Sequence, residues 1–236
     1  RRIVGRHPRR RYRESRVVRI AGSTLELVYG RQDCGSPRNE RELELPTGIA
    51  VDALGDIYIA DTGRHRLAKI ARDGSGFEIV AGITDTPGLT GERLAATRAR
   101  LDSPEDVAID RDGALLISDT GNGRIRRVDP NTKEIATIVG QVDAPDMGAF
   151  ADARLVNPTS MTWIPSLSSF FVAGGASGRI FRADLNAREL SVIAAEPGGY
   201  EYGTDPTATR AVRAALAQLL RGASGLAYDA REHTVY

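Results

Sequence analysis

A stretch of 38 residues that occurs twice constrains this chain more than any other feature of its sequence. Residues 45–82 read LPTGIAVDALGDIYIADTGRHRLAKIARDGSGFEIVAG, and residues 103–140 read SPEDVAIDRDGALLISDTGNGRIRRVDPNTKEIATIVG. The second copy follows the first by 58 positions, and the proline, the Asp-x-x-Gly, the Asp-Thr-Gly and the next arginine coincide without a gap. A self-match of this length predicts an architecture built from stacked copies of one unit.

Each copy contains four short apolar runs that are separated by turn residues. In the first copy these runs lie at 49–51, 57–59, 67–70 and 77–80, with Asp and Gly between them. Runs of this length, rich in β-branched and aromatic residues, are typical of strands, and none is long enough to show the period of a helix. A four-stranded antiparallel sheet repeated at this spacing is typical of a propeller blade, so we predict an all-β fold.

The motif of the first copy, PxGIAVDxxGxIYIADTGxHRLxKI, resembles the NHL-repeat family. The blades of that family carry the same Pro-Gly start, the same Asp-x-x-Gly hairpin and the same Asp-x-Gly-x-x-Arg corner. Residues 88–104, which join the two copies, resemble the linker between the blades of bacterial NHL proteins. The resemblance covers nearly the whole chain and implies a β-propeller, usually of six blades.

Aligned to this repeat, the chain is one propeller domain, 1–236, that begins and ends inside a blade. The third copy is degenerate, and residues 23–44 and 196–220 are expected to be linkers, the second with a short helix. The expected parts are a half blade at 1–22, blades at 45–82, 103–140 and 157–194, and a half blade at 223–236.

Two arrangements of these parts are compatible with the sequence. The two half blades could join and close a ring of four blades, which is the low end of the known range. Alternatively the chain is a fragment of a six-bladed ring. The start at Arg1 rather than at a methionine, and the end at Tyr236 inside a strand, favour the fragment.

Composition excludes several classes of protein. No run of 18 apolar residues exists, so no membrane span is predicted, and no signal peptide is visible. Cys34 is the sole cysteine, which excludes an internal disulfide and leaves an extracellular or cell-surface location open. Lys69 and Lys133 are the only lysines, and this preference for arginine indicates a GC-rich bacterial genome.

The recurring acidic residues are interpreted as structural. An Asp in Asp-x-x-Gly or Asp-Thr-Gly accepts backbone N–H groups in a turn. What every blade contains builds the blade, so a functional site is expected where the blades differ. The residues interpreted in this way are Asp52, Asp110 and Asp229 in hairpins, Asp61 and Asp119 at corners, and Arg66, Arg124 and Arg179 as ties between strands or corners.

The chain contains no recognised metal or catalytic signature. His7, His65 and His233 are scattered and lack ligand spacing, so neither a metal nor another cofactor is predicted. No phosphate-binding loop and no Gly-x-Ser-x-Gly elbow is present.

Positive charge is concentrated near the N-terminus. Residues 1–19 hold nine arginines and one glutamate, a net charge of +8, so the rest of the chain carries −7 to give the total of +1. Arginines with a tyrosine on a hairpin can neutralise phosphates and stack a base. The candidate binding residues are Arg9, Arg10, Arg11, Tyr12 and Arg13 in that hairpin, and Tyr200 and Tyr202 in a linker that could face a partner.

The leading functional hypothesis is a non-enzymatic scaffold that binds a protein or a glycan through loops on a propeller face. The first alternative, implied by the wider six-bladed group, is a metal-dependent lactonase or a lyase. The positions expected to line the central channel are Gly48, Asp106, Ser160 and Gly225, which include one carboxylate. The second alternative is RNA binding through the arginine-rich hairpin, since some NHL propellers bind RNA through a basic face.

Overall fold

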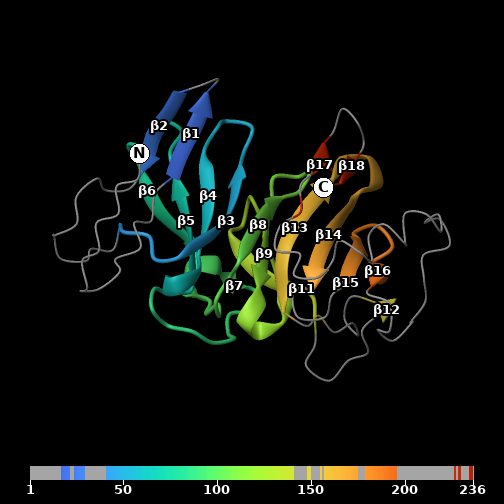
Figure 1. Cartoon of the computed structure of the whole chain (residues 1–236). Helices are drawn as coiled ribbons and strands as arrows, with labels where there is room; N and C mark the ends of the chain where they lie inside the picture. Colours follow the sequence, from blue (N-terminus) through green and yellow to red (C-terminus); the bar gives the residue numbers. More distant parts are fainter. Residues whose placement is uncertain are drawn as a thin grey trace, which may run out of the picture.

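The computed structural model of the chain is built from antiparallel sheets (Figure 1). The structure describes residues 17–21, 24–29, 41–140, 148–149, 155, 157–174, 179–195, 226, 228–229 and 234–235. Within these ranges the helical elements are single 3-10 turns: η1 (Thr62–Arg64), η2 (Ala96–Arg98), η3 (Thr120–Asn122) and η5 (Pro165–Leu167). The predicted all-β class is confirmed.

The first copy of the repeat forms one four-stranded sheet, as predicted. Its strands pair in sequence order, each antiparallel to the next. They are β3 (Pro46–Val51), β4 (Ile57–Asp61), β5 (Arg66–Ile70) and β6 (Phe77–Ala81).

The second and third copies form similar sheets, each with one additional strand. The extra strands, β7 (Leu94–Ala95) and β12 (Gly148–Ala149), come from segments between the copies and pair with the outermost strand. The second sheet contains β8 (Asp106–Ile109), β9 (Leu115–Asp119), β10 (Arg124–Val128) and β11 (Glu134–Val139). The third contains β13 (Pro158–Ile164), β14 (Ser169–Gly174), β15 (Arg179–Asp184) and β16 (Glu189–Ala195).

Two further pairs of strands lie near the ends of the chain. β1 (Val17–Ala21) pairs with β2 (Thr24–Tyr29), and β17 (Tyr228–Asp229) pairs with β18 (Thr234–Val235). The prediction of a polar linker at 23–44 is wrong for Thr24–Tyr29. The sequence TLELVY is apolar enough for a strand, but the repeat alignment ended the blade at Gly22. The predicted helix at 208–221 lies outside the described residues.

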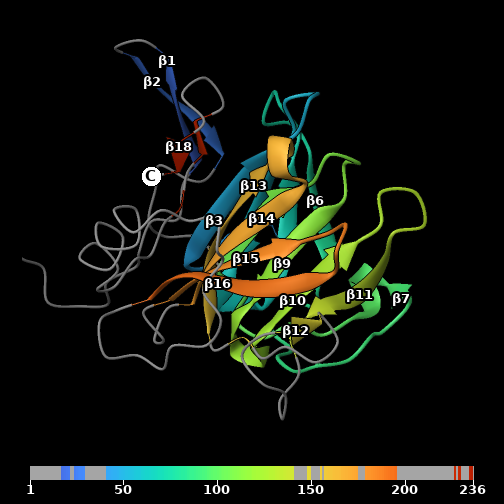
Figure 2. The same cartoon turned by 90° about the vertical axis from the view of Figure 1, so that its right-hand side faces the viewer.

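Apolar side chains fill the space between consecutive sheets, which stack face to face (Figures 1 and 2). Each fully buried aliphatic or aromatic side chain contributes about 1.5–3 kcal/mol of transfer free energy. The largest cluster joins the second and third sheets through Leu116, Ile125, Phe170, Val172 and Phe181.

The first strands of the three sheets lie side by side, because β8 contacts both β3 and β13. These are the inner strands, and the other strands of each copy follow them outward in sequence order. None of the helical turns in the described residues is long and apolar enough to cross a membrane.

Candidate binding face

The corners between the second and third strands are held by the aspartate of Asp-Thr-Gly. Asp61 Oδ1 accepts the backbone N–H of Glu44 at 2.5 Å, and Asp119 Oδ1 accepts that of Asp102 at 2.7 Å. In both blades the donor belongs to the segment that precedes the blade. These carboxylates therefore fasten each linker to the corner, as predicted from their repetition.

The threonine of the same motif joins each blade to the next. Thr62 Oγ1 donates to the carbonyl of Pro104 at 2.6 Å, and Thr120 Oγ1 donates to the carbonyl of Pro158 at 2.5 Å. Both prolines stand at the start of the following blade. The Asp-Thr-Gly corner of one blade and the first proline of the next blade therefore form a contact between blades.

The Asp-x-x-Gly aspartates close the hairpins between the first and second strands. Asp52 and Asp110 each accept, through Oδ1, the backbone N–H groups two and four positions further on, all at 2.9 Å. The prediction that these residues are structural is confirmed.

Arg66 ties its corner to the preceding linker, also as predicted. Its Nε lies 2.7 Å from Asp61 Oδ2, and both side chains are fully buried. Its remaining nitrogens donate to the Glu42 carbonyl at 2.9 Å and to Thr84 Oγ1 at 3.1 Å. One guanidinium thus connects the corner of the first blade with the segments that precede and follow that blade.

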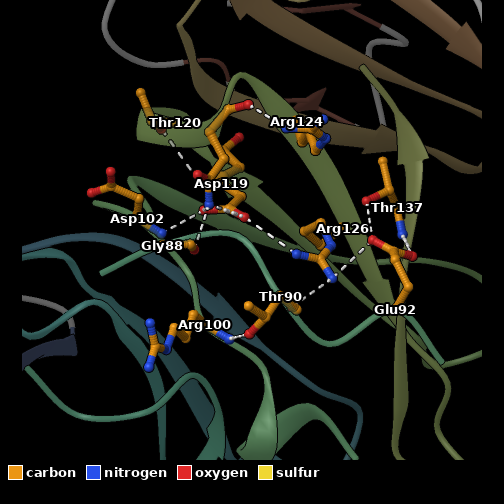
Figure 3. A network of polar contacts seen from close by, with 12 residues as sticks. Gly88, Thr90, Glu92, Arg100, Asp102, Asp119, Thr120, Arg124, Arg126 and Thr137 are labelled. Carbon is orange, nitrogen blue, oxygen red and sulfur yellow. Dashed lines mark hydrogen bonds and ion pairs between the residues drawn. The ribbon is translucent and has the colours of Figure 1, made fainter. Parts of the chain in front are cut away.

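In the second blade a different arginine performs this role (Figure 3). Arg124 donates to the carbonyl of Asn122 in its own corner. The fully buried Arg126, two residues later, lies 3.5 Å from Asp119 Oδ2 and 3.1 Å from Glu92 Oε1. Residues two apart on a strand point to the same face, so Arg126 can reach the carboxylate diagonally. Arg124 is predicted to tie strands or corners together. In the structure it bonds within its own corner, and Arg126 makes the tie to the preceding linker.

The inner strands meet through a chain of contacts at the expected channel-lining positions. Asp106 Oδ2 accepts the backbone N–H of Met161 at 2.6 Å and the hydroxyl of Ser160 at 3.1 Å. Ser160 Oγ in turn accepts the N–H of Leu226 at 2.9 Å. On the other side, Asp106 abuts Gly48. The structure brings Gly48, Asp106 and Ser160 together as predicted, and Gly225 lies outside the described residues.

Burial raises the pKa of Asp106 to about 6, although the N–H groups of Met161 and Val107 and the Ser160 hydroxyl oppose this shift. Asp106 Oδ1 also accepts the Val107 N–H at 2.8 Å. Both carboxylate oxygens are thus used as acceptors by the protein itself, which suits a tie between blades.

The stability of the fold is expected to fall as the pH rises from about 4 to about 6. Burial raises the pKa of Asp106 and of Asp119 to about 6, so the folded state holds protons that the unfolded state has released. At about 1.4 kcal/mol per pKa unit, the shift from 3.8 to about 6 means that each carboxyl costs roughly 3 kcal/mol once the pH exceeds its folded pKa. Thermal unfolding measured between pH 4 and pH 8 tests this expectation.

The variant Asp106→Asn is the matched control for that profile. It removes one of the two titrations, so its unfolding midpoint should depend less on pH than that of the wild type, whatever its absolute stability. An unchanged dependence on pH would show that Asp106 does not titrate in this range.

The corner of the first blade differs from that of the second and forms a polar cluster. Arg64 binds Asp85 with two nitrogens, at 3.2 and 3.1 Å. His65 Nδ1 accepts the N–H of Ser103 at 3.0 Å and lies 3.3 Å from Asp102 Oδ1. We call these five residues the polar corner. It lies on the face that carries η1, η3 and the linkers, which we call the corner face. The second blade has Asn122 and Gly123 in place of Arg64 and His65.

The polar corner contains a serine, a histidine and an aspartate, but not in the geometry of a nucleophilic triad. The Ser103 hydroxyl donates to Asp102 at 3.0 Å rather than to the imidazole. Since His65 Nδ1 accepts a backbone N–H, it cannot donate to the carboxylate as a triad histidine does. The arrangement orders the loop and leaves polar groups at the surface, which suits recognition better than nucleophilic catalysis.

Several predicted site residues cannot be placed relative to this cluster. Arg9, Arg10, Arg11, Tyr12, Arg13, Tyr200 and Tyr202 all lie outside the described residues. In the described part of the chain, no group of three or more His, Cys, Asp or Glu side chains could hold a metal ion.

Comparison with known proteins agrees with this architecture. The family model for the NHL repeat matches residues 43–70 and 101–128, which are the first three strands of the first two blades and the residues that lead into them. The chain belongs to the NHL-repeat family. Human NHL repeat-containing protein 3 is 28% identical over 182 residues, which cover 75% of this chain and 43% of that protein.

Solved structures share the propeller fold of this NHL-repeat chain. A nidogen/laminin complex includes a chain that matches with a TM-score of 0.58 at 13% identity, over 92% of this chain and 64% of that one. An auxiliary nutrient binding protein from Bacteroides ovatus matches with a TM-score of 0.54 at 18% identity, over 78% and 44%. At such identities the likeness concerns the fold. The chain spans less than half of the length of the curated relatives compared with it.

Proposed function

We propose that this chain is a non-enzymatic binding scaffold that presents the corner face of the propeller to a protein or glycan partner. The polar corner carries the proposal, because the first two blades differ there and it retains partly exposed polar groups. Asp85, at its edge, has a side chain that is 60% exposed.

The use of the repeated charged residues supports this proposal. Asp61, Asp119, Arg66 and Arg126 are buried and bind one another or the linkers. The rigid frame that they build holds surface loops in place, as suits a site that recognises rather than transforms its ligand. Two of the solved relatives, the nidogen/laminin complex and the nutrient binding protein, are named for binding.

The proposal is tested with arrays of defined oligosaccharides and of defined peptides. The informative variant is Arg64→Asn with His65→Gly, because it gives the first corner the residues of the second and keeps a residue suited to the left-handed backbone at 65. We expect the wild type to bind at least one member of the arrays. The affinity for that ligand should fall by about tenfold or more, or 1.4 kcal/mol, in this variant.

The control variant is Arg111→Gln, in the exposed turn between β8 and β9 at the opposite ends of the strands. It should leave the affinity unchanged. Failure to bind either array, or equal loss in both variants, contradicts the proposal. Hydrolysis of a lactone that is lost in Asp106→Asn favours the enzymatic alternative instead.

A further inference from the structure

The linker between the first two blades folds into a compact loop. Its two arms are joined where the Gly88 N–H donates to the Leu101 carbonyl at 3.2 Å and the Arg100 N–H donates to Thr90 Oγ1 at 3.2 Å. We call residues 88–101 the arginine loop, and it contains the short strand β7 at the outer edge of the second sheet (Figure 1). Both blades that it joins are complete sheets, and the loop itself is described throughout.

The inner side of the arginine loop holds it to the second blade. Glu92 Oε2 accepts the Thr137 N–H at 2.9 Å, and Glu92 Oε1 accepts the Thr137 hydroxyl at 2.5 Å and lies 3.1 Å from Nη2 of the buried Arg126 (Figure 3). The buried apolar residues of the loop belong to the cluster between the first two sheets and are Ala96, Ala99 and Leu101. The carboxylate of the loop is therefore occupied, and the loop is fixed without help from its outer side chains.

The outer side of the arginine loop carries unpaired positive charge. Arg93, Arg98 and Arg100 are exposed, and among the described residues no hydrogen bond or ion pair engages their guanidinium groups. Figure 3 shows the Arg100 side chain pointing away from the network of polar contacts. Leu89 and Leu94 are 40% and 44% exposed. The loop thus presents cations together with apolar side chains to the solvent.

The linker that follows the second blade has the same frame but a different outer side. Its strand β12 begins 54 positions after β7, and in the same alignment Leu155 falls on Leu101 and Arg154 on Arg100. The outer side differs at Arg93, Leu94 and Arg98, where the second linker has Met147, Gly148 and Asp152. What both linkers share builds the linker, so the three residues that differ are expected to serve something other than the fold.

The backbone does not explain an arginine at position 93. The φ of Arg93 is 58°, in the left-handed region. Glycine adopts this region most readily, followed by asparagine and aspartate. The arginine therefore costs the turn some stability, and what it contributes is its charge.

The exposed groups of the arginine loop fit carboxylates that belong to a protein. A guanidinium binds a carboxylate with two parallel hydrogen bonds. Single-stranded nucleic acid would also need rings on which its bases stack, and residues 88–101 contain no aromatic residue. Leu94, beside Arg93, is suited instead to an apolar side chain of a partner. Arg93 and Arg98 are five positions apart, so their Cα atoms lie within about 18 Å, which an extended peptide of about six residues spans.

We propose that the arginine loop binds an acidic segment of a partner protein. Arg93 and Arg98 bind carboxylates of that segment, and Leu94 packs against an apolar side chain between them. These residues are different from those of the polar corner, so the inference goes beyond the proposed function and each can fail without the other.

The test is a titration of the 236-residue protein into a fluorescent peptide of four Glu-Leu-Glu repeats, followed by anisotropy at two salt concentrations. A second peptide with serine in place of leucine carries the same charge without the apolar groups. We expect the leucine peptide to bind about tenfold or more tightly than the serine peptide, and both affinities to fall as the salt concentration rises.

Two variants separate the charge from the apolar contact. Arg98→Asp gives the loop the residue of the second linker and should lower the affinity for both peptides by about tenfold or more, because a repulsive charge replaces an attractive one. Leu94→Ser should reduce the preference for the leucine peptide to less than about threefold. Both side chains are exposed, so thermal unfolding should show both variants folded like the wild type.

Two controls keep the result specific to the outer side of the loop. Arg100→Gln removes a charge of the shared frame, and Arg64→Asn with His65→Gly changes the polar corner. Each should change the affinity by less than about threefold. A loss in either control as large as that in Arg98→Asp overturns the assignment to Arg93 and Arg98.

Other outcomes of the titration also overturn the proposal. They are the absence of saturable binding to the leucine peptide, equal affinity for the two peptides, and tighter binding of a single-stranded oligonucleotide of equal charge, which would make the partner a nucleic acid. If Arg98→Ser self-associates and keeps the wild-type affinity for the peptide, the arginine only protects the edge of β7.

Discussion

Replacement of Asp61 by alanine is expected to lower the free energy of unfolding by about 3–5 kcal/mol, the usual cost of breaking a buried ion pair. The variant leaves the guanidinium of Arg66, 2.7 Å away and fully buried, without its carboxylate. It also removes the acceptor of the Glu44 N–H, which fastens the linker. Chemical denaturation of the wild type and the variant measures the difference.

Two further variants make this prediction specific to the buried pair. Asp112→Asn changes the exposed pair with Arg111 and should cost less than about 1 kcal/mol. The double variant Asp61→Ala with Arg66→Leu should be more stable than Asp61→Ala alone, because the uncompensated charge is gone. If the second replacement instead adds to the loss, the stability comes from the other bonds of Arg66 and not from the charge pair.

The repeated motif was enough to predict the sheets, because its strand-length runs and its Asp-x-x-Gly turns are determined by residues that are close together in the chain. Runs at 57–59 and 77–80 became β4 and β6 with ends shifted by at most two residues. The turn aspartates could be interpreted without a structure, because Asx-type turns depend on neighbours two to four residues away. Short-range chemistry of this kind is visible in the sequence.

The elements that the sequence did not predict depend on contacts between distant segments. β7 has only two residues, and it is a strand because the linker passes beside β11. The second blade's buried pair uses Arg126, whose place is taken by Ala68 in the first blade. The sequence indicates this difference by an arginine in the second copy at the strand position where the first copy has an alanine.

The location of the candidate site could be predicted from the sequence, but the set of residues that form it could not. The expectation that function lies where blades differ leads to Arg64 and His65, but the sequence by itself shows only a histidine without ligand spacing at this corner. The partners of His65, Asp102 and Ser103, are nearly 40 residues away in the chain, and Asp85, the partner of Arg64, is 21 residues away. The sequence gives no spacing rule for such a meeting, because it depends on how the linker between blades folds back over the corner.

Replacement of Gly48 by alanine is expected to separate the inner strands of the first two blades. A Cβ atom at Gly48 would lie 2.4 Å from Asp106 Oδ1, 2.5 Å from Asp106 Cα and 2.6 Å from the Glu105 carbonyl oxygen. Two of these atoms belong to the backbone and cannot turn away. Overpacking of this kind typically costs about 1–3 kcal/mol, and we expect the upper end because a whole strand must move.

The control Gly76→Ala isolates the effect of crowding from that of losing a glycine. A Cβ at Gly76 meets the Ala71 Cβ at 3.3 Å as its nearest neighbour, and neither Gly48 nor Gly76 has a positive φ. Gly76→Ala should therefore change the free energy of unfolding by less than about 1 kcal/mol.

Adding Asp106→Gly to Gly48→Ala should restore little, because the Asp106 backbone and the Glu105 carbonyl remain. Full rescue by Asp106→Gly would mean that only the carboxylate fills the space beside Gly48. In that case the backbones of β3 and β8 leave room for a methyl group at Gly48, contrary to the distances from Asp106 Cα and the Glu105 carbonyl oxygen.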